Sequence, residues 1–134
     1  PSCEHQIIHL VLGKFVNDGH LARRTFPIKD ACDLINILEG ADRAVELKLV
    51  QQQCGRSFTL FYSLVCELMN YYGRIRIADF EDTSKYTWMM QKSFESRFIR
   101  EVLDAYARTE YLARALAYNP KKLPGYLRRL TSSN

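Results

Sequence analysis

The sequence predicts an all-α protein folded as a single domain over residues 1–134. Two observations lead there. The chain has 134 residues, of which 47% are hydrophobic, so it fits one domain and can fill a buried core. Apolar residues recur at spacings of three and four along nearly the whole chain, which is the periodicity of amphipathic helices. No internal repeat or low-complexity tract interrupts the pattern, and about seven helices around one core are expected.

The first two helices have clear sequence boundaries. A first helix is predicted from Gln6 onwards. It should stop at Asn17-Asp18-Gly19, because glycine readily adopts the left-handed cap conformation. Pro27 can open a second helix, which should end at Gly40. The predicted apolar stripe of this second helix consists of Ile28, Cys32, Ile35 and Leu38.

The middle of the chain is its most apolar part. A short third segment follows Asp42, and Ser57 is the candidate N-cap of the next helix. That helix is hydrophobic on most sides, which favours a central position in the bundle. Its apolar residues are Phe58, Leu60, Phe61, Leu64, Val65, Leu68 and Met69.

A long final helical region is predicted from the cap Ser84 to Asn119. Its buried side is expected to carry Trp88, Phe94, Phe98, Val102, Ala105 and Leu112. A last short helix is predicted within residues 123–130, and the alternating stretch 75–80 is interpreted as helical because its surroundings are helical.

No catalytic or metal-binding arrangement stands out, so an enzyme, a cofactor and a metal are not expected. His5 and His9 share a helix face but lack a third ligand nearby, and an ordinary helix surface is favoured. The four cysteines lack a C-x-x-C pair and are interpreted as reduced thiols. No apolar stretch approaches the roughly 20 residues that span a bilayer.

The apolar central helix leads into a sequence that resembles the Bcl-2 family. The family's BH-1 signature reads Asn-Trp-Gly-Arg-Ile, and here residues 71–75 read Tyr-Tyr-Gly-Arg-Ile. The end of the first helix, Lys14-Phe-Val-Asn-Asp-Gly-His20, is similar to the end of the BH-4 helix. A BH-3-like pattern is formed by Ile28, Cys32 and Asp33, and a second register starts at Ile37. The BH-2 motif is nearly lost, and this erosion in a short chain is similar to viral members.

The resemblance implies a Bcl-2-like helical bundle with a hydrophobic surface groove that binds an amphipathic helix. Arg74 would pair with the Asp of the bound BH-3 helix, and Gly73 would permit its close approach. The residues implied for this ligand groove are Ile35, Leu38, Val45, Leu49, Phe61, Val65, Tyr71, Gly73, Arg74 and Ile77.

The implied function is anti-apoptotic: capture of BH-3 helices from Bim-, Bak- or Bax-like proteins would inhibit mitochondrial apoptosis. A cytoplasmic protein, active there or at the mitochondrial outer membrane, is expected from the resemblance. A homodimer and a pore-forming relative stay open as alternatives. A different class also stays open: an oligomerisation or nucleic-acid-binding domain that uses the basic cluster Lys121, Lys122, Arg128 and Arg129. Nucleic acid is not the expected partner, because the basic residues are scattered among 15 acidic ones.

Overall fold

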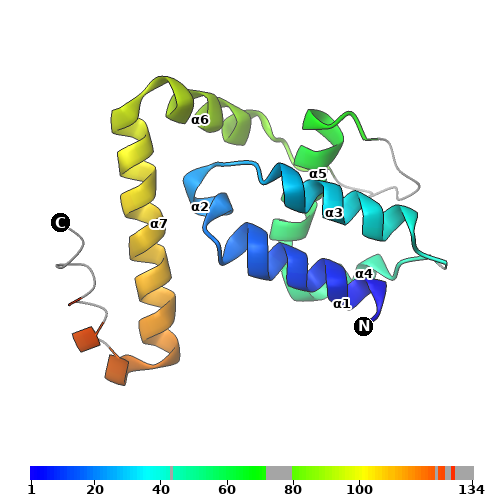
Figure 1. Ribbon diagram of the computed structural model, residues 1–134, viewed down its shortest axis with the longest axis horizontal. Helices are drawn as coiled ribbons and strands as arrows, with labels where there is room; N and C mark the ends of the chain where they lie inside the picture. Colours follow the sequence, from blue (N-terminus) through cyan, green and yellow to red (C-terminus); the bar gives the residue numbers. More distant parts are fainter. Residues whose placement is uncertain (43, 72–79, 123, 126–127, 129–134) are drawn as a thin grey trace.

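The computed structural model describes residues 1–42, 44–71, 80–122, 124–125 and 128, and every regular element within these ranges is helical (Figure 1). The elements in chain order are α1 (Cys3–His9), the π-helix η1 (Leu10–Val16), α2 (His20–Arg23), α3 (Ile28–Glu39), α4 (Leu47–Cys54), α5 (Arg56–Leu68), α6 (Ser84–Glu95), α7 (Arg97–Tyr118) and the 3-10 helix η2 (Pro120–Lys122). For this part of the chain, the all-α prediction is confirmed. None of the helices so described combines the length and the apolar character that crossing a bilayer requires.

Helix α5 is the most deeply buried element, as its apolar sequence predicts. Its side chains Phe58, Tyr62 and Leu64 are almost completely inaccessible to solvent. Helix η1 packs against α5, while α1 contacts both α3 and α4. Burying an aromatic or aliphatic side chain of this size gives about 1.5–3 kcal/mol, so α5 is the main source of hydrophobic stabilisation.

Helix α1 begins three residues earlier than the sequence predicts, because the hydroxyl of Ser2 accepts a hydrogen bond from the backbone N–H of His5. The helix then continues as the π-helix η1 and stops before Gly19, whose φ of +83° is left-handed. The Glu4 side chain is buried, and its Oε1 accepts a 2.9 Å hydrogen bond from the backbone N–H of Glu46. This contact joins the start of α1 to the start of α4.

Helix α3 has the predicted boundaries but buries a different stripe. Pro27 is its N-cap and Gly40 its C-cap. The predicted stripe included Ile28 and Cys32, but Ile28 is 65% exposed and Cys32 also faces solvent. The core side of α3 carries Ala31, Leu34 and Leu38 instead. Both stripes have helical spacing and share Leu38, so periodicity alone could not choose between them.

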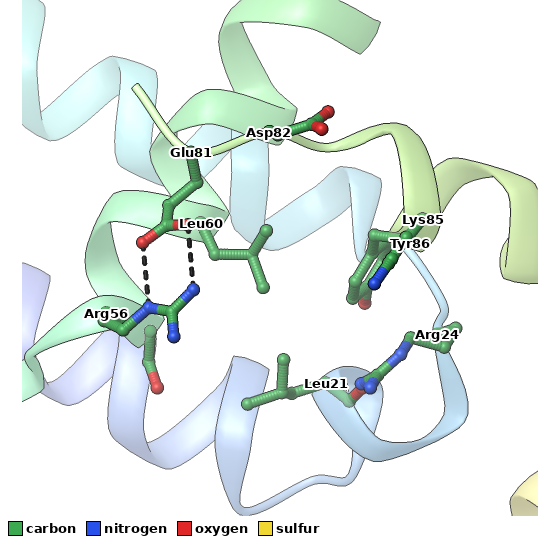
Figure 2. A pocket seen from close by; sticks show the side chains of 9 residues that line it. Leu21, Arg24, Arg56, Leu60, Glu81, Asp82, Lys85 and Tyr86 are labelled. Atoms are coloured by element: carbon green, nitrogen blue, oxygen red, sulfur yellow. Dashed lines mark hydrogen bonds and ion pairs between the residues drawn. The ribbon is translucent and has the colours of Figure 1, made fainter. Parts of the chain in front are cut away.

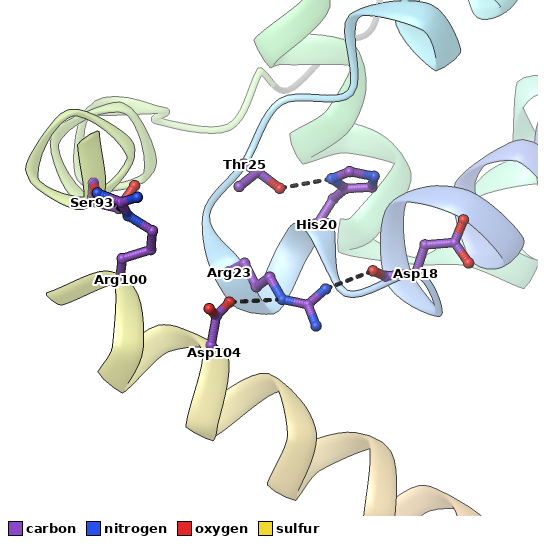
Figure 3. A network of polar contacts seen from close by, with 7 residues as sticks. All are labelled: Asp18, His20, Arg23, Thr25, Ser93, Arg100 and Asp104. Atoms are coloured by element: carbon purple, nitrogen blue, oxygen red, sulfur yellow. Dashed lines mark hydrogen bonds and ion pairs between the residues drawn. The ribbon is translucent and has the colours of Figure 1, made fainter. Parts of the chain in front are cut away.

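Helices α6 and α7 are separate, where one long helix was predicted. The chain breaks at Ser96, whose hydroxyl caps α7 by accepting a hydrogen bond from the backbone N–H of Ile99. In Figure 1, α6 leads away from α3 and α5, and α7 runs down one side of the molecule near α2. The Arg23 Nε donates a 3.0 Å hydrogen bond to Asp104 Oδ1, which holds α7 against α2 (Figure 3).

The face of α7 that contacts the rest of the protein is not the predicted one. The buried side chains of α7 are Leu103 and Ala107. Phe94 and Phe98, both predicted to be buried, are 76% and 73% exposed. Trp88 of α6 and Val102 of α7 are also exposed, whereas Leu112 of the predicted face is half-buried. A helix with apolar residues on two sides does not reveal which side its neighbours cover, and here α2 covers the side with small residues.

Candidate ligand groove

Several residues of the predicted groove lie in the hydrophobic core or at its border. Ile35 and Leu38 come from α3, and Val45 lies just before α4. Leu38 belongs to the core cluster that contains Phe61 and Val65 of α5, and the other two side chains pack against that cluster. These residues therefore belong to the same hydrophobic core or border it, as do most buried apolar residues of the described part of the chain.

The two α5 residues nevertheless offer no surface in this structure. Phe61 is 0% exposed and Val65 is also fully buried. The Phe61 ring stacks on Phe15 at a centroid distance of 4.7 Å and lies 6.4 Å from Phe26. Both α5 residues are part of the core. Only half-buried residues at the border of the core are accessible to a ligand. Among the predicted groove residues, Ile35, Val45 and Tyr71 pack against the core cluster while half-buried, and Leu49 of α4 is also half-buried.

Tyr71 links the BH-1-like sequence to the BH-3-like helix. Its hydroxyl donates a 2.6 Å hydrogen bond to Glu39 Oε1 at the end of α3. Tyr71 is half-buried and packs against the core cluster. The contact fixes where the chain leaves α5, beside the C-terminal end of α3. Gly73, Arg74 and Ile77 lie outside the described residues.

A polar pocket of about 350 Å³ lies between α2, α5 and the start of α6 (Figure 2). Arg56 and Glu81 form a two-point ion pair across it, with Nε–Oε1 at 3.0 Å and Nη2–Oε2 at 3.1 Å. The hydrogen bond from Arg56 lowers the pKa of the Glu81 carboxyl, and the same pairing raises the pKa of Arg56. The two charges largely neutralise each other, and the remaining charged lining residues are Arg24, Lys85 and the acidic Asp82.

Tyr86 forms one wall of this pocket and joins α6 to the loop around α2. Its hydroxyl lies 2.9 Å from the backbone carbonyl oxygen of His20 and 2.5 Å from that of Thr25. The Arg24 guanidinium lies over its ring, 5.5 Å from the centroid. Burial raises the pKa of the Tyr86 phenol well above its usual range, partly opposed by the charge of Arg24.

Replacing Tyr86 by phenylalanine should lower the free energy of unfolding by about 1–2 kcal/mol at neutral pH, because the one phenol proton shared by the carbonyl oxygens of His20 and Thr25 is lost. The folded-state pKa of Tyr86 is raised, so its contribution is complete below the unfolded value of about 10 and is lost as the pH rises above it. Urea unfolding of the parent and of Tyr86→Phe should therefore show a difference that shrinks above about pH 10. A difference that stays constant with pH would contradict this assignment.

Two further pockets lie elsewhere on the molecule. One pocket, of about 470 Å³, is lined by residues of η1, α2 and α7, among them Ala22, Tyr111 and Arg114. The other, about 790 Å³, is a shallow apolar surface on α1 and η1 around Ile8 and Leu12. Within the described residues, these two pockets and the polar one include none of the predicted groove residues.

The cysteine and histidine side chains form no metal cluster within the described ranges. Cys3, Cys32, Cys54 and Cys66 are all free thiols. Burial raises the pKa of the Cys54 thiol to about 11, which keeps it protonated at neutral pH. Cys54 therefore acts as a small hydrophobic side chain of the core.

The scan of family models, the search of curated proteins and the search of solved structures each gave no match to this chain. The class that the fold itself defines is thus an all-α protein with one apolar central helix. The likeness to the Bcl-2 family stays a prediction that rests on the three short sequence motifs.

The sequence did not point to the ion pairs that hold the elements together. Arg56 and Glu81 are 25 residues apart, and Arg23 and Asp104 are 81 apart. Charged residues at such separations carry no periodic signal, because the fold alone decides which of many carboxylates each arginine meets.

Proposed function

We propose that this chain is a survival-promoting protein of the Bcl-2 type, which binds the BH-3 helix of pro-apoptotic proteins in a hydrophobic groove. The observation that supports it most is the hydrogen bond between Tyr71 and Glu39. It brings Tyr71, the first residue of the BH-1-like sequence 71–75, next to the end of the BH-3-like helix α3. The resemblance implies this same neighbourhood for a ligand groove.

The half-buried apolar residues at this edge suit a ligand helix with hydrophobic residues at spacings of three and four. Ile35, Val45 and Leu49 are partly covered and partly accessible. Each ligand side chain that becomes buried against such residues contributes about 1.5–3 kcal/mol before the costs of ordering. Uncovering part of Val65 or Phe61 by a movement of α3 would deepen the site.

Arg74 supplies the specificity in this proposal. A guanidinium pairs with the carboxylate of a BH-3 Asp through two parallel hydrogen bonds, a geometry that lysine cannot reproduce. Gly73 beside it leaves room for the ligand backbone. A protein that holds BH-3 helices in this way keeps them from their pro-apoptotic partners and so inhibits mitochondrial apoptosis.

Calorimetric titration with Bim-, Bak- and Bax-like BH-3 peptides tests the proposal. We expect a sub-micromolar Kd for at least one peptide and a loss of about 10-fold to 100-fold in Arg74→Ala. Arg97→Ala is the matched control, because it removes the same charge at a side chain that is 87% exposed on α7. A folded parent protein that binds none of the peptides would refute the function.

A double-mutant cycle sharpens the role of Arg74. Replacing the peptide's Asp by Ala should weaken binding to the parent by a similar factor, but should change binding to Arg74→Ala little. Independent, additive losses would show that Arg74 does not contact that carboxylate, even if the groove itself is real.

A further inference from the structure

Helix α7 carries a stripe of apolar and small residues, here called the α7 stripe: Phe98, Val102, Ala105, Thr109, Leu112 and Leu116. Successive members are four, three, four, three and four residues apart. The first four are exposed and the last two are half-buried. This is the alternating spacing of the a and d positions in a coiled-coil seam.

The exposed part of the α7 stripe points away from the rest of the molecule. Leu103 and Ala107, which are buried, lie on the opposite side of the helix. Two more exposed aromatic residues, Trp88 and Phe94, precede the stripe on α6. An apolar surface of this length on one helix is typical of an interaction site.

Two charged residues flank the α7 stripe on the same side. Glu101 and Arg108 are seven residues apart, so they occupy equivalent positions next to the seam. Both are exposed. Arg97 Nε donates a 2.9 Å hydrogen bond to Glu101 Oε1 on the same helix, and Glu101 retains accessible surface.

We propose that the α7 stripe binds the α7 stripe of a second copy of this chain, with the two helices antiparallel. In a two-fold arrangement, Glu101 of each copy faces Arg108 of the other, which gives two identical ion pairs. The same register places Val102 against Ala105 of the second copy and Phe98 against Thr109. A larger side chain then meets a smaller one in each layer, as close packing requires.

The charges flanking the seam select antiparallel over parallel helices. In a parallel pair, Glu101 faces Tyr106 and Arg108 faces Ala113, so no ion pair forms. The antiparallel pair satisfies both charges at once. The complementarity of Glu101 and Arg108 is thus the argument for a second copy as the occupant.

A longer antiparallel register would place Phe98 against Leu116 and Val102 against Leu112. It would bring larger apolar side chains together, but it also sets the two Arg108 side chains against each other. Repulsion between like charges disfavours that register. Leu112 and Leu116 are already half-buried within their own chain, so a second copy has less of their surface left to cover. The shorter register uses only exposed members of the stripe.

Sedimentation velocity over a concentration series tests the dimer and its register. We expect a concentration-dependent dimer in the parent, and a monomer in Val102→Glu at the same concentrations. Arg108→Glu places two acidic residues together at both ends and should raise the dimer Kd about tenfold or more. The charge swap Glu101→Arg with Arg108→Glu should restore the parent Kd to within about threefold.

Lys121→Glu is the control for Arg108→Glu, because it also replaces a basic residue by an acidic one, at an exposed position outside the α7 stripe. Each variant alters only an exposed side chain, and circular dichroism should show unchanged helicity. A parent that stays monomeric at about 1 mM refutes the proposal, and so does a dimer that survives Val102→Glu. A charge swap that fails to restore the dimer refutes the register. The binding of BH-3 peptides is measured separately. The described groove residues lie between the start of α3 and Tyr71, so none of them belongs to the α7 stripe.

Discussion

Phe61→Ala should lower the free energy of unfolding by about 3–5 kcal/mol, the largest loss that we expect from a single substitution. The side chain is completely buried on the central helix, and its ring stacks on Phe15. Truncation removes the transfer free energy of the ring and leaves a cavity that α5 and η1 cannot close without moving. The loss of stacking with Phe15 adds to both effects.

Urea unfolding followed by circular dichroism measures this effect, and Phe94→Ala is the matched control. Phe94 is 76% exposed, so the same truncation should change the free energy of unfolding by less than about 0.5 kcal/mol. Similar losses in both variants would mean that α6 packs onto the body through Phe94, as the sequence predicts, and would contradict the exposure of this ring.

Leu34→Ala should cost about 2–4 kcal/mol, because Leu34 is completely buried at the centre of the core stripe of α3. Ile28→Ala removes a side chain that is 65% exposed and should cost less than about 0.5 kcal/mol. Comparing the free energies of unfolding of these two variants decides which side of α3 is buried: the one in the structure or the one predicted from the sequence.

The same unfolding experiment with Ile28→Ala also bears on the BH-3-like register of α3. If Ile28→Ala proves the more costly substitution, α3 is rotated, and the side chains now exposed on it belong to the core. If Leu34→Ala is the more costly one, Ile28 and Cys32 face solvent as described, and the groove edge is formed by Ile35.

Those parts of the fold that depend on local chemistry could be predicted from the sequence. Gly19 needs a left-handed conformation, and Pro27 and Gly40 bound α3, so these ends were placed correctly. The central position of α5 followed from its uniformly apolar character. Such signals act within a few residues and need no knowledge of the neighbours.

The orientation of a helix about its own axis depends on its neighbours, and there the sequence was not sufficient. Helix α7 offers Leu103 and Ala107 on one side and larger residues such as Phe98 on the other. The larger, more apolar face was predicted to be buried, but the contact with α2 covers the smaller one. Apolar content alone cannot anticipate such a choice, because it depends on the Arg23–Asp104 pair and on the break at Ser96.

The candidate groove stays a prediction. The motifs named Ile35, Leu38 and Val45, which lie in the hydrophobic core or border it. The sequence could not decide between a groove wall and a core position for Phe61, because both have the same apolar character, and the structure places it in the core. The role of Arg74 stays a prediction that rests on the motif.

Tyr86 is the one member of the core cluster that comes from beyond residue 71 within the described part of the chain. The terminal helices are held to the body mainly by the packing of α7 on α2, by the Tyr86 side chain and by the Arg23–Asp104 pair. Local opening of α6 and α7 needs far less free energy than global unfolding, which must dismantle α5. We therefore expect α6 and α7 to be the less stable part of the molecule and to open locally while the core around α5 persists.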